Sequence, residues 1–187
     1  MMPYSVFNVF DTKFAEYIKS KITVYKDWPK EGVNFMNTVD LCKDPNAFND
    51  SIEWFVALFN KESAIVAADA RGFIWGAAVA SKLRIPLHVA RKPNKLPGKL
   101  YSEAYELEYG SNVIELSAEF PINGPVMIID DVLATGGTAV AICNLLHKHF
   151  NIPYEQMTVA VLLNLTFLPG HSELSKLGVT VKSIINE

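Results

Sequence analysis

The chain has 187 residues, half of them hydrophobic, with a formal net charge of −3. This length and composition suit one domain with a substantial core, while the weak negative charge and the scattered lysines and arginines argue against nucleic-acid binding. No apolar run approaches the roughly 20 residues of a membrane span and the N-terminus lacks the pattern of a secretory leader, so we expect a cytoplasmic protein with no membrane partner.

The first 40 residues contain a predicted helix and an exposed loop. Residues 1–10 are apolar and aromatic, and no role follows from their pattern. After Asp11, a plausible N-cap, apolar residues at helical spacing predict an amphipathic helix that ends near Lys21. The Trp-Pro-Lys-Glu-Gly cluster at 28–32 is typical of an exposed loop. Residues 33–35 then continue as a short extended piece.

The next segment predicts a second helix with a buried face. Asp44 and Pro45 are a favourable N-cap and first helical residue. An apolar stripe follows at helical spacing and continues to Phe59. We expect this stripe to pack into the core.

From residue 64 onwards, strand patterns alternate with helix patterns, which indicates an α/β fold with a mostly parallel central sheet and right-handed crossovers. A loop rich in lysine, proline and glycine and a β-hairpin interrupt this alternation. The predicted elements are a strand at 64–68, a helix at 73–83, a strand at 87–90, the basic loop at 91–99, hairpin strands at 105–107 and 113–116, a strand at 126–129 with a helix up to 150, a strand at 157–163, a helical turn at 172–177 and a strand at 179–185.

The stretch Pro125–Thr138 carries the strongest functional signal. Its apolar beginning reads as a buried strand, after which we expect the chain to leave the core. Asp130 and Asp131 then supply two carboxylates, and residues 134–138 supply glycines and hydroxyls before a helix, an arrangement that suits an anion. Carboxylates repel a bare phosphate but accept hydrogen bonds from sugar hydroxyls or bind a metal. The pattern therefore predicts a site for a sugar that bears a phosphate.

Two common nucleotide motifs are absent from this stretch. No Gly-Lys-Ser/Thr follows the glycines, as a Walker loop would require, and the Gly-x-Gly-x-x-Gly turn is missing.

In open α/β sheets, ligands bind beyond the carboxyl ends of the strands. We therefore expect the three loops at 69–72, 91–98 and 130–138 to share one cleft.

Residues 130–138, Asp-Asp-Val-Leu-Ala-Thr-Gly-Gly-Thr, resemble the phosphoribosyl-pyrophosphate (PRPP) loop of type I phosphoribosyltransferases, and of the adenine-specific branch in particular. The resemblance implies one phosphoribosyltransferase domain over 1–187, with a small N-terminal hood at about 1–40, a flexible β-hairpin loop over the active site, and a homodimer. Further matching pieces follow the family's order and spacing, at 29–33, 43–45, 70–73, 91–98 and 106–110.

The reaction implied by the resemblance is purine salvage: 5-phosphoribose passes from PRPP to adenine, giving AMP and pyrophosphate, with Mg²⁺ as cofactor. Breaking the bond from ribose C1 to pyrophosphate builds positive charge on the sugar. Negative charge gathers on the leaving pyrophosphate, which needs cations around it.

The resemblance also assigns roles to single residues. Glu108 is the implied proton handler for the purine nitrogens, and Asp130 and Asp131 would hold the ribose hydroxyls, directly or through the metal. An exposed loop glutamate and a surface ion pair are the ordinary alternatives for Glu108 and Arg71. Cations available to pyrophosphate are Arg71, Arg91, Lys92 and Lys95. Groups implied around the 5′-phosphate belong to Ala134, Thr135, Gly136, Gly137 and Thr138.

The resemblance is weaker at the purine pocket. Phe35 would stack on adenine and Leu165 would close the opposite face. The backbone of Asn34 and Met36 would read the base edge, but family members usually have Arg-Asp where this chain has Met36 and Asn37. A 6-oxopurine substrate, hypoxanthine or guanine, is therefore an alternative. A non-catalytic PRPP sensor and a binding domain with a relic cleft are others.

Overall fold

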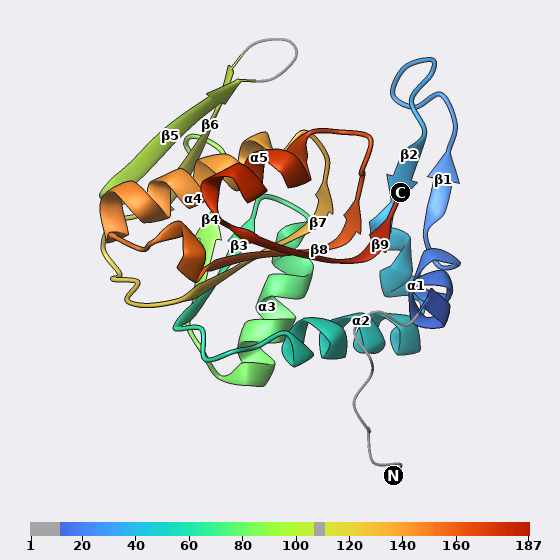
Figure 1. Cartoon of the computed structure of the whole chain (residues 1–187), viewed down its shortest axis with the longest axis horizontal. Coiled ribbons are helices and arrows are strands. Elements are labelled where there is room, and N and C mark those ends of the chain that lie inside the picture. The colour runs from blue at the N-terminus through green and yellow to red at the C-terminus, as the bar shows by residue number, and fades with distance from the viewer. Residues whose placement is uncertain (1–11, 107–110) are drawn as a thin grey trace.

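The computed structural model describes residues 12–106 and 111–187 and has an α/β architecture (Figure 1). In chain order, its helices and strands are α1 Thr12–Lys19, β1 Thr23–Tyr25, β2 Phe35–Asn37, the 3₁₀ helix η1 Thr38–Lys43, α2 Pro45–Ala57, β3 Ala64–Ala68, α3 Gly72–Leu83, β4 Leu87–Ala90, β5 Leu100–Glu106, β6 Ser111–Ser117, β7 Val126–Leu133, α4 Gly137–Phe150, the 3₁₀ turn η2 Tyr154–Gln156, β8 Met157–Asn164, α5 Gly170–Leu177 and β9 Thr180–Asn186.

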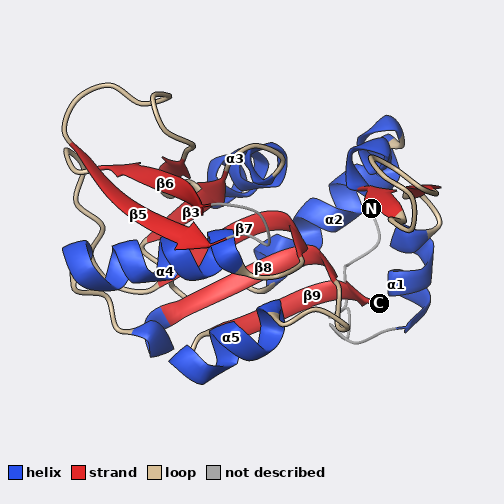
Figure 2. Cartoon of the chain, turned by 90° about the horizontal axis from the view of Figure 1, so that it is seen from above, coloured by secondary structure: helices blue, strands red, loops and turns tan. Residues whose placement is uncertain are grey.

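A five-stranded parallel sheet in the order β4-β3-β7-β8-β9 forms the centre of the described chain. Successive side chains of a strand point to opposite faces, so each apolar strand feeds two cores. Ile65 and Met127 pack with α1, α2 and α3 on one face. Val66 and Ile128 pack with α4, α5 and the β5–β6 hairpin on the other. Figure 2 shows the two helical layers on either side of the sheet.

The strand order positions the site. From β3 the chain moves outward to β4, and it later returns to the other side of β3 as β7. The direction of winding therefore reverses between β3 and β7, and a crevice at their carboxyl ends is the usual ligand site of such sheets. The antiparallel pairs β1–β2 and β5–β6 lie outside the central sheet, and Figure 1 shows them on opposite sides of its carboxyl edge.

The predicted end of the strand after residue 129 was wrong. Strand β7 continues to Leu133, because its pairing with β8 extends four residues beyond its last pair with β3, at Ile129. Asp130 and Asp131 therefore lie inside a strand, and Asp131 is 2% exposed. This burial gives the two acids different surroundings.

Smaller differences concern the ends of elements. Helix α2 begins after its Asp44 cap as predicted but ends at Ala57, so Phe59 lies beyond it. The hairpin is confirmed, with longer strands than expected, and the extended piece near the hood is shifted to Phe35–Asn37. None of the helices in the described part of the chain combines the length and apolar character that crossing a membrane requires.

Candidate active site

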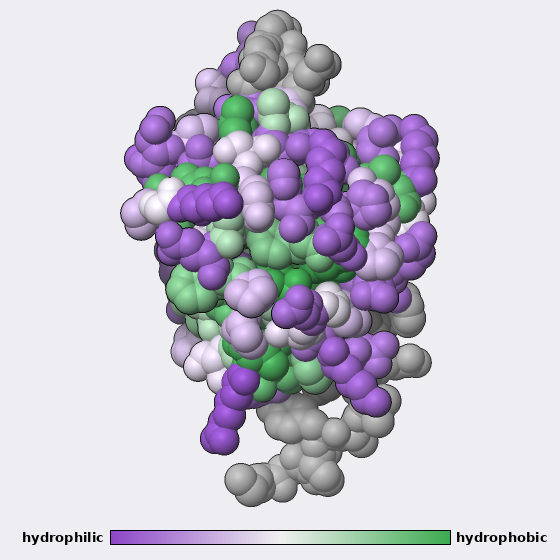
Figure 3. All heavy atoms as spheres, turned by 90° about the vertical axis from the view of Figure 1, so that its left-hand side faces the viewer, coloured by the Kyte–Doolittle hydropathy of each residue, from purple (hydrophilic) through white to green (hydrophobic). Residues whose placement is uncertain are grey.

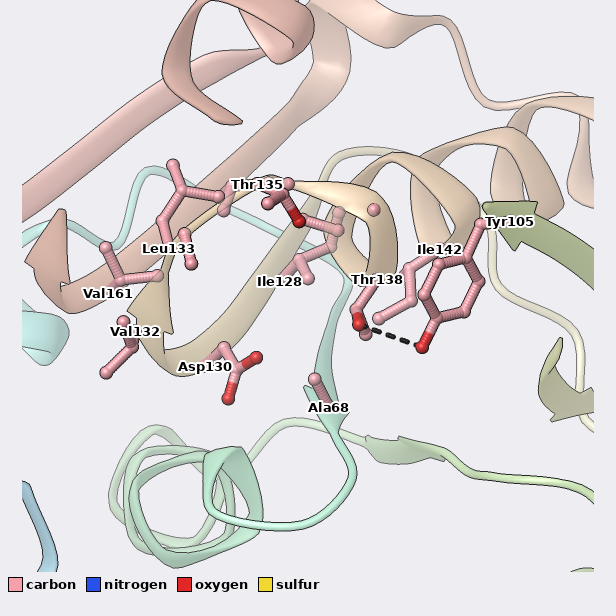
Figure 4. A pocket seen from close by; sticks show the side chains of 15 residues that line it. Ala68, Tyr105, Ile128, Asp130, Val132, Leu133, Thr135, Thr138, Ile142 and Val161 are labelled. Atoms are coloured by element: carbon pink, nitrogen blue, oxygen red, sulfur yellow. Dashed lines mark hydrogen bonds between the residues drawn. The ribbon is translucent and has the colours of Figure 1, made fainter. Parts of the chain in front are cut away.

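The loop from Leu133 to α4 forms a small concave surface (Figure 4). Gly136 has φ +86°, and a Cβ atom there would lie 2.7 Å from the Cα atom of Gly170. The Gly170 N–H also donates to the Ala134 carbonyl at 3.1 Å, which fixes the loop against α5. The N-terminus of α4, with its free backbone N–H groups, faces a cavity of about 100 Å³ that the loop lines. A helix N-terminus beside a cavity is the arrangement that suits an anion, so the predicted phosphate site stays a prediction that this geometry supports.

The neighbouring acids have different partners. Asp131 is buried, and its Oδ2 atom accepts from the Thr38 hydroxyl and forms an ion pair with Arg71 Nε at 3.0 Å. Asp130 is half-buried, and its Oδ1 atom accepts from the Asp131 backbone N–H at 2.8 Å. Asp130 lines both cavities of the site, whereas one oxygen of Asp131 already serves two donors. Asp130 is therefore the acid more open to a ligand.

The environment of Asp130 favours its neutral form. Burial raises the pKa of this carboxyl well above its ordinary value, and the adjacent charge of Asp131 raises that pKa further. Arg71 opposes these two effects more weakly. A ligand that brings positive charge or hydroxyl donors would stabilise the ionised form.

A second, polar cavity of about 250 Å³ adjoins the loop. Residues from all three predicted segments, 69–72, 91–98 and 130–138, contribute to it, which confirms the prediction that they share one cleft. Strands β5 and β6 complete its wall. Its lining residues are Asp69, Ala70, Arg71, Lys92, Tyr105, Asn112, Ile114, Asp130, Asp131, Val132 and Thr138.

The predicted cations are placed differently. Arg71 and Lys92 line the polar cavity. Arg91 forms an ion pair with Asp69 at 3.2 Å and lies over the ring of Phe73, with its Cζ atom 5.5 Å from the ring centre. Lys95 is exposed in the basic loop and is not among the residues that line either cavity. The structure therefore brings Arg71 and Lys92 together, and the roles of Arg91 and Lys95 stay predictions.

Comparison with known proteins identifies the family of this chain. Residues 43–164 match the family model of the phosphoribosyl transferase domain. The chain is 39% identical to adenine phosphoribosyltransferase of Mycoplasmopsis agalactiae over 169 residues, which cover 90% of this chain and 98% of the relative. The chain belongs to the adenine phosphoribosyltransferase family.

Solved structures of adenine phosphoribosyltransferases have the same fold. The enzyme of Thermoanaerobacter pseudethanolicus aligns with a TM-score of 0.83 at 36% identity, over 92% of this chain and 99% of that one. The enzyme of Trypanosoma brucei, solved in complex with AMP, pyrophosphate and ribose-5-phosphate, aligns with a TM-score of 0.82 at 26% identity, over 95% of this chain and 81% of that one. The type I phosphoribosyltransferase fold expected from the sequence is thereby confirmed.

The base-binding segment expected for an adenine phosphoribosyltransferase lies on β2 and just before it. Asn34 is exposed and Phe35 is half-buried. The Phe35 ring meets Trp28 edge-on at 4.5 Å, and the Cζ atom of Arg71 lies 5.4 Å from the centre of the Phe35 ring. The base segment is thus in contact with a cation of the polar cavity.

Two further residues predicted to contact the base pack against the core. Met36 and Leu165 are half-buried and pack against the same core cluster, on the side of the sheet that carries α1, α2 and α3. They come from opposite ends of the chain, and their contacts are apolar. Their roles toward a purine stay predictions.

Sequence reasoning missed Thr38 and Tyr105. Thr38 is fully buried and bonds Asp131, which lies 93 residues away. Tyr105 accepts a hydrogen bond from the Thr138 hydroxyl at 3.1 Å and lines both cavities. The alternation along the hairpin gives a weak signal for Tyr105, because Tyr101, Glu103 and Tyr105 share one face. No local pattern distinguishes Thr38 from other threonines. Glu108, the predicted proton handler, lies outside the described residues.

The acids suit a metal that arrives with substrate. The described residues contain no group of three or more His, Cys, Asp or Glu side chains able to hold a metal ion by themselves. Asp130 lines the polar cavity and offers carboxylate oxygen, the donor that Mg²⁺ prefers. Mg²⁺ usually keeps several waters and shares one or two carboxylates with substrate phosphates. The donor set therefore fits Mg²⁺ held jointly by Asp130 and a phosphate-bearing ligand.

Proposed function

We propose that this chain transfers 5-phosphoribose from PRPP to adenine and releases AMP and pyrophosphate, the reaction of its family. The observation that carries the proposal is the convergence of three features on adjoining cavities: an anion-binding loop, a partly exposed acid and a paired arginine. Arg71 also touches the predicted base-stacking ring of Phe35. Phosphate, ribose, pyrophosphate and base sites are therefore contiguous.

In this proposal, the loop at 134–138 binds the 5′-phosphate through backbone N–H groups, that of Thr138 among them, and the Thr135 hydroxyl. The Thr138 hydroxyl donates to Tyr105. Asp130 accepts hydrogen bonds from the ribose hydroxyls, and its carboxylate would stabilise the positive charge that develops on the sugar. Arg71 and Lys92 line the polar cavity and stabilise the negative charge on departing pyrophosphate. Asp131 holds Arg71 in place through their ion pair.

Mg²⁺ is proposed as the cofactor that neutralises pyrophosphate and orients it against the ribose when bound. Asp130 would hold it, directly or through water, and Asp131 would contribute less because Thr38 and Arg71 occupy its Oδ2 atom. Glu108 is retained as the proposed proton handler for the purine, from the family motif that contains it.

Adenine is the proposed base, with Phe35 and Leu165 on its two faces and the backbone of Asn34 and Met36 at its edge. Backbone recognition is insensitive to the side-chain differences at Met36 and Asn37.

The deciding experiment offers adenine, hypoxanthine and guanine separately and in competition, with PRPP and Mg²⁺, and follows nucleotide and pyrophosphate formation. AMP as the main product supports the proposal. IMP or GMP would keep the mechanism and overturn the choice of base. PRPP binding without any nucleotide would instead identify a sensor or a relic binding domain.

We also propose a homodimer. Support comes from an apolar surface along β4, at one edge of the sheet, where a cavity of about 260 Å³ lies between β4, β6 and the basic loop. Leu87 is 39% and Phe120 64% exposed there. Figure 3, which views the molecule from the left-hand side of Figure 1, shows hydrophobic side chains interspersed with hydrophilic ones on that face. Light scattering of Phe120→Asp should report a smaller species. Phe167→Asp, at a site 75% exposed, is the matched control.

The chain is proposed to form a single phosphoribosyltransferase domain over 1–187, in which about 1–40 act as the hood. The cytoplasmic location stays a prediction from the sequence.

A further inference from the structure

Tyr105 stands at the border of the phosphate loop and the polar cavity. It is half-buried, and it lines both spaces. The Thr138 hydroxyl donates to the Tyr105 hydroxyl at 3.1 Å, and Figure 4 shows this bond beside the loop, with Asp130 lining the same cavity. The family motifs noted in the sequence do not include this residue.

The position of Tyr105 is fixed by a row of contacts between β5 and α4. Near the C-terminal end of α4, the Tyr101 ring stacks on His149 at 4.1 Å with an interplanar angle of 9°. In the middle, Glu103 accepts from Asn144 at 3.4 Å and pairs with Lys148.

At the N-terminal end of α4, Tyr105 meets Thr138. The strand thus follows the helix along its length, and it delivers the phenol hydroxyl to the helix N-terminus before any ligand binds. Such preorganisation reduces the entropic cost of binding.

The hydrogen-bond chemistry of the phenol indicates its ligand. A tyrosine hydroxyl can accept a hydrogen bond and donate one. The bond from Thr138 uses its accepting capacity, and within residues 12–106 and 111–187 no acceptor for its proton is found. An anion at the N-terminus of α4 would supply oxygen acceptors at this place.

We propose that Tyr105 binds the 5′-phosphate of PRPP and of the nucleotide product by donating its O–H to a phosphate oxygen. The ligand's identity rests on the proposed function. Tyr105 also directly precedes Glu106 and the segment that carries Glu108. The same hydrogen bond would therefore tie the substrate's phosphate to the strand that leads to the proposed proton handler.

Calorimetric titration of the full chain tests this assignment. The variant is Tyr105→Phe, and the probes are ribose 5-phosphate, AMP and pyrophosphate. Loss of a hydrogen bond to a charged phosphate should weaken the binding of ribose 5-phosphate and AMP roughly ten-fold or more. The affinity for pyrophosphate should stay unchanged. Tyr101→Phe is the matched control, because it removes a hydroxyl from the same face of the same strand, away from both cavities, and should leave all three affinities unchanged.

Three results would overturn the proposal. Unchanged affinity for ribose 5-phosphate and AMP would show that the hydroxyl makes no such bond. A reduced affinity for pyrophosphate alone would show that Tyr105 contacts pyrophosphate and not the 5′-phosphate. A lower melting temperature than in Tyr101→Phe, with all three affinities reduced alike, would show a structural role. A chain that bound ribose 5-phosphate but formed no AMP would sink the proposed reaction, while these titrations would still decide the role of Tyr105.

Discussion

The phosphate side and the base side of the site are built in different ways. On the proposed phosphate side, residues 132–139 line the cavity as one contiguous segment of the chain. On the base side, Phe35, Trp28 and Arg71 come from separate segments and meet through their side chains. A site formed by one contiguous segment is visible as a sequence motif, whereas a site assembled from distant side chains is not.

A buried hydrogen-bonded group joins the two sides. Thr38 immediately follows β2, which carries Phe35, and its hydroxyl bonds Asp131 next to Asp130. Arg71 bonds the same Asp131 oxygen and lies over Phe35. Substitutions on either side should therefore alter activity that depends on the other side, to an extent set by these shared contacts.

The largest predicted effect is a difference between the two acids, because replacing Asp130 should reduce activity and replacing Asp131 should reduce stability. Asp130→Asn should lower kcat/KM roughly 100- to 1,000-fold, as loss of a charged group that acts in the transition state does, with no loss of stability. Asp131→Asn should cost about 2 kcal/mol of unfolding free energy, between the values for exposed and buried pairs, because Arg71 is 36% exposed. Steady-state kinetics and urea unfolding measure both. Full activity in the double variant would refute the ribose site.

Gly136→Ala should disrupt the phosphate side alone. Its Cβ atom would meet the Gly170 backbone at 2.7 Å, so the loop must move. A displacement near 1 Å in a positioning element can reduce activity roughly 100-fold, and we expect this loss in kcat/KM for PRPP. Gly32→Ala is the control, because Gly32 has a similar φ of +83° but an added Cβ would meet no described atom within 4 Å. Equal losses in both variants would point to backbone strain rather than the clash.

Thr38→Val should weaken the link between the sides. It removes a hydrogen bond from a buried carboxylate, which should lower the unfolding free energy by about 1 to 3 kcal/mol. Because Asp131 then holds Arg71 less firmly, kcat should fall roughly 3- to 10-fold. Thr38→Ser keeps the hydroxyl and should restore most of the kcat. Failure of serine to rescue it would mean that the methyl group, and not the bond, matters.

The pH dependence of stability should report Asp130. Its pKa is raised in the folded state above the ordinary value of 3.8, so the folded protein retains a proton that the unfolded chain has lost. Stability contributed by this group must therefore fall as pH rises from about the unfolded value through the raised pKa. The difference in unfolding free energy between wild type and Asp130→Asn should decrease over that interval. A difference that stayed constant with pH would contradict the burial of this carboxyl.

The smallest effect is expected at Asn34. Its side chain is exposed, and the proposed contact with adenine uses its backbone. Asn34→Ala should change the ratio of kcat/KM for adenine to that for hypoxanthine by less than about three-fold, in line with the about 0.5 kcal/mol typical of surface substitutions. A larger change in competition assays would move base selection to this side chain.

Much of the fold could be predicted because its signals are local. Apolar runs such as 64–68 and 157–163 gave the buried strands, and Asp44 with Pro45 gave the start of α2. The end of β7 was misjudged because pairing with β8, a non-local interaction, carries the strand through two acids that locally resemble a loop. The hairpin strands were underestimated for a similar reason, since Leu100 and Tyr101 are held by distant partners.

The sequence by itself determined the alternation of strands and helices, the glycine-containing loop before α4 and the convergence of three loops on one cleft. Each of these follows from local propensity or from the geometry of parallel sheets. Only the tertiary structure decided which acid lines both cavities and that Thr38 and Tyr105 bond to residues of the candidate site. Asp130 and Asp131 are adjacent and chemically identical, so their difference arises from partners far away in the chain. Burial and distant hydrogen bonds, which exist only after folding, separate one acid from the other.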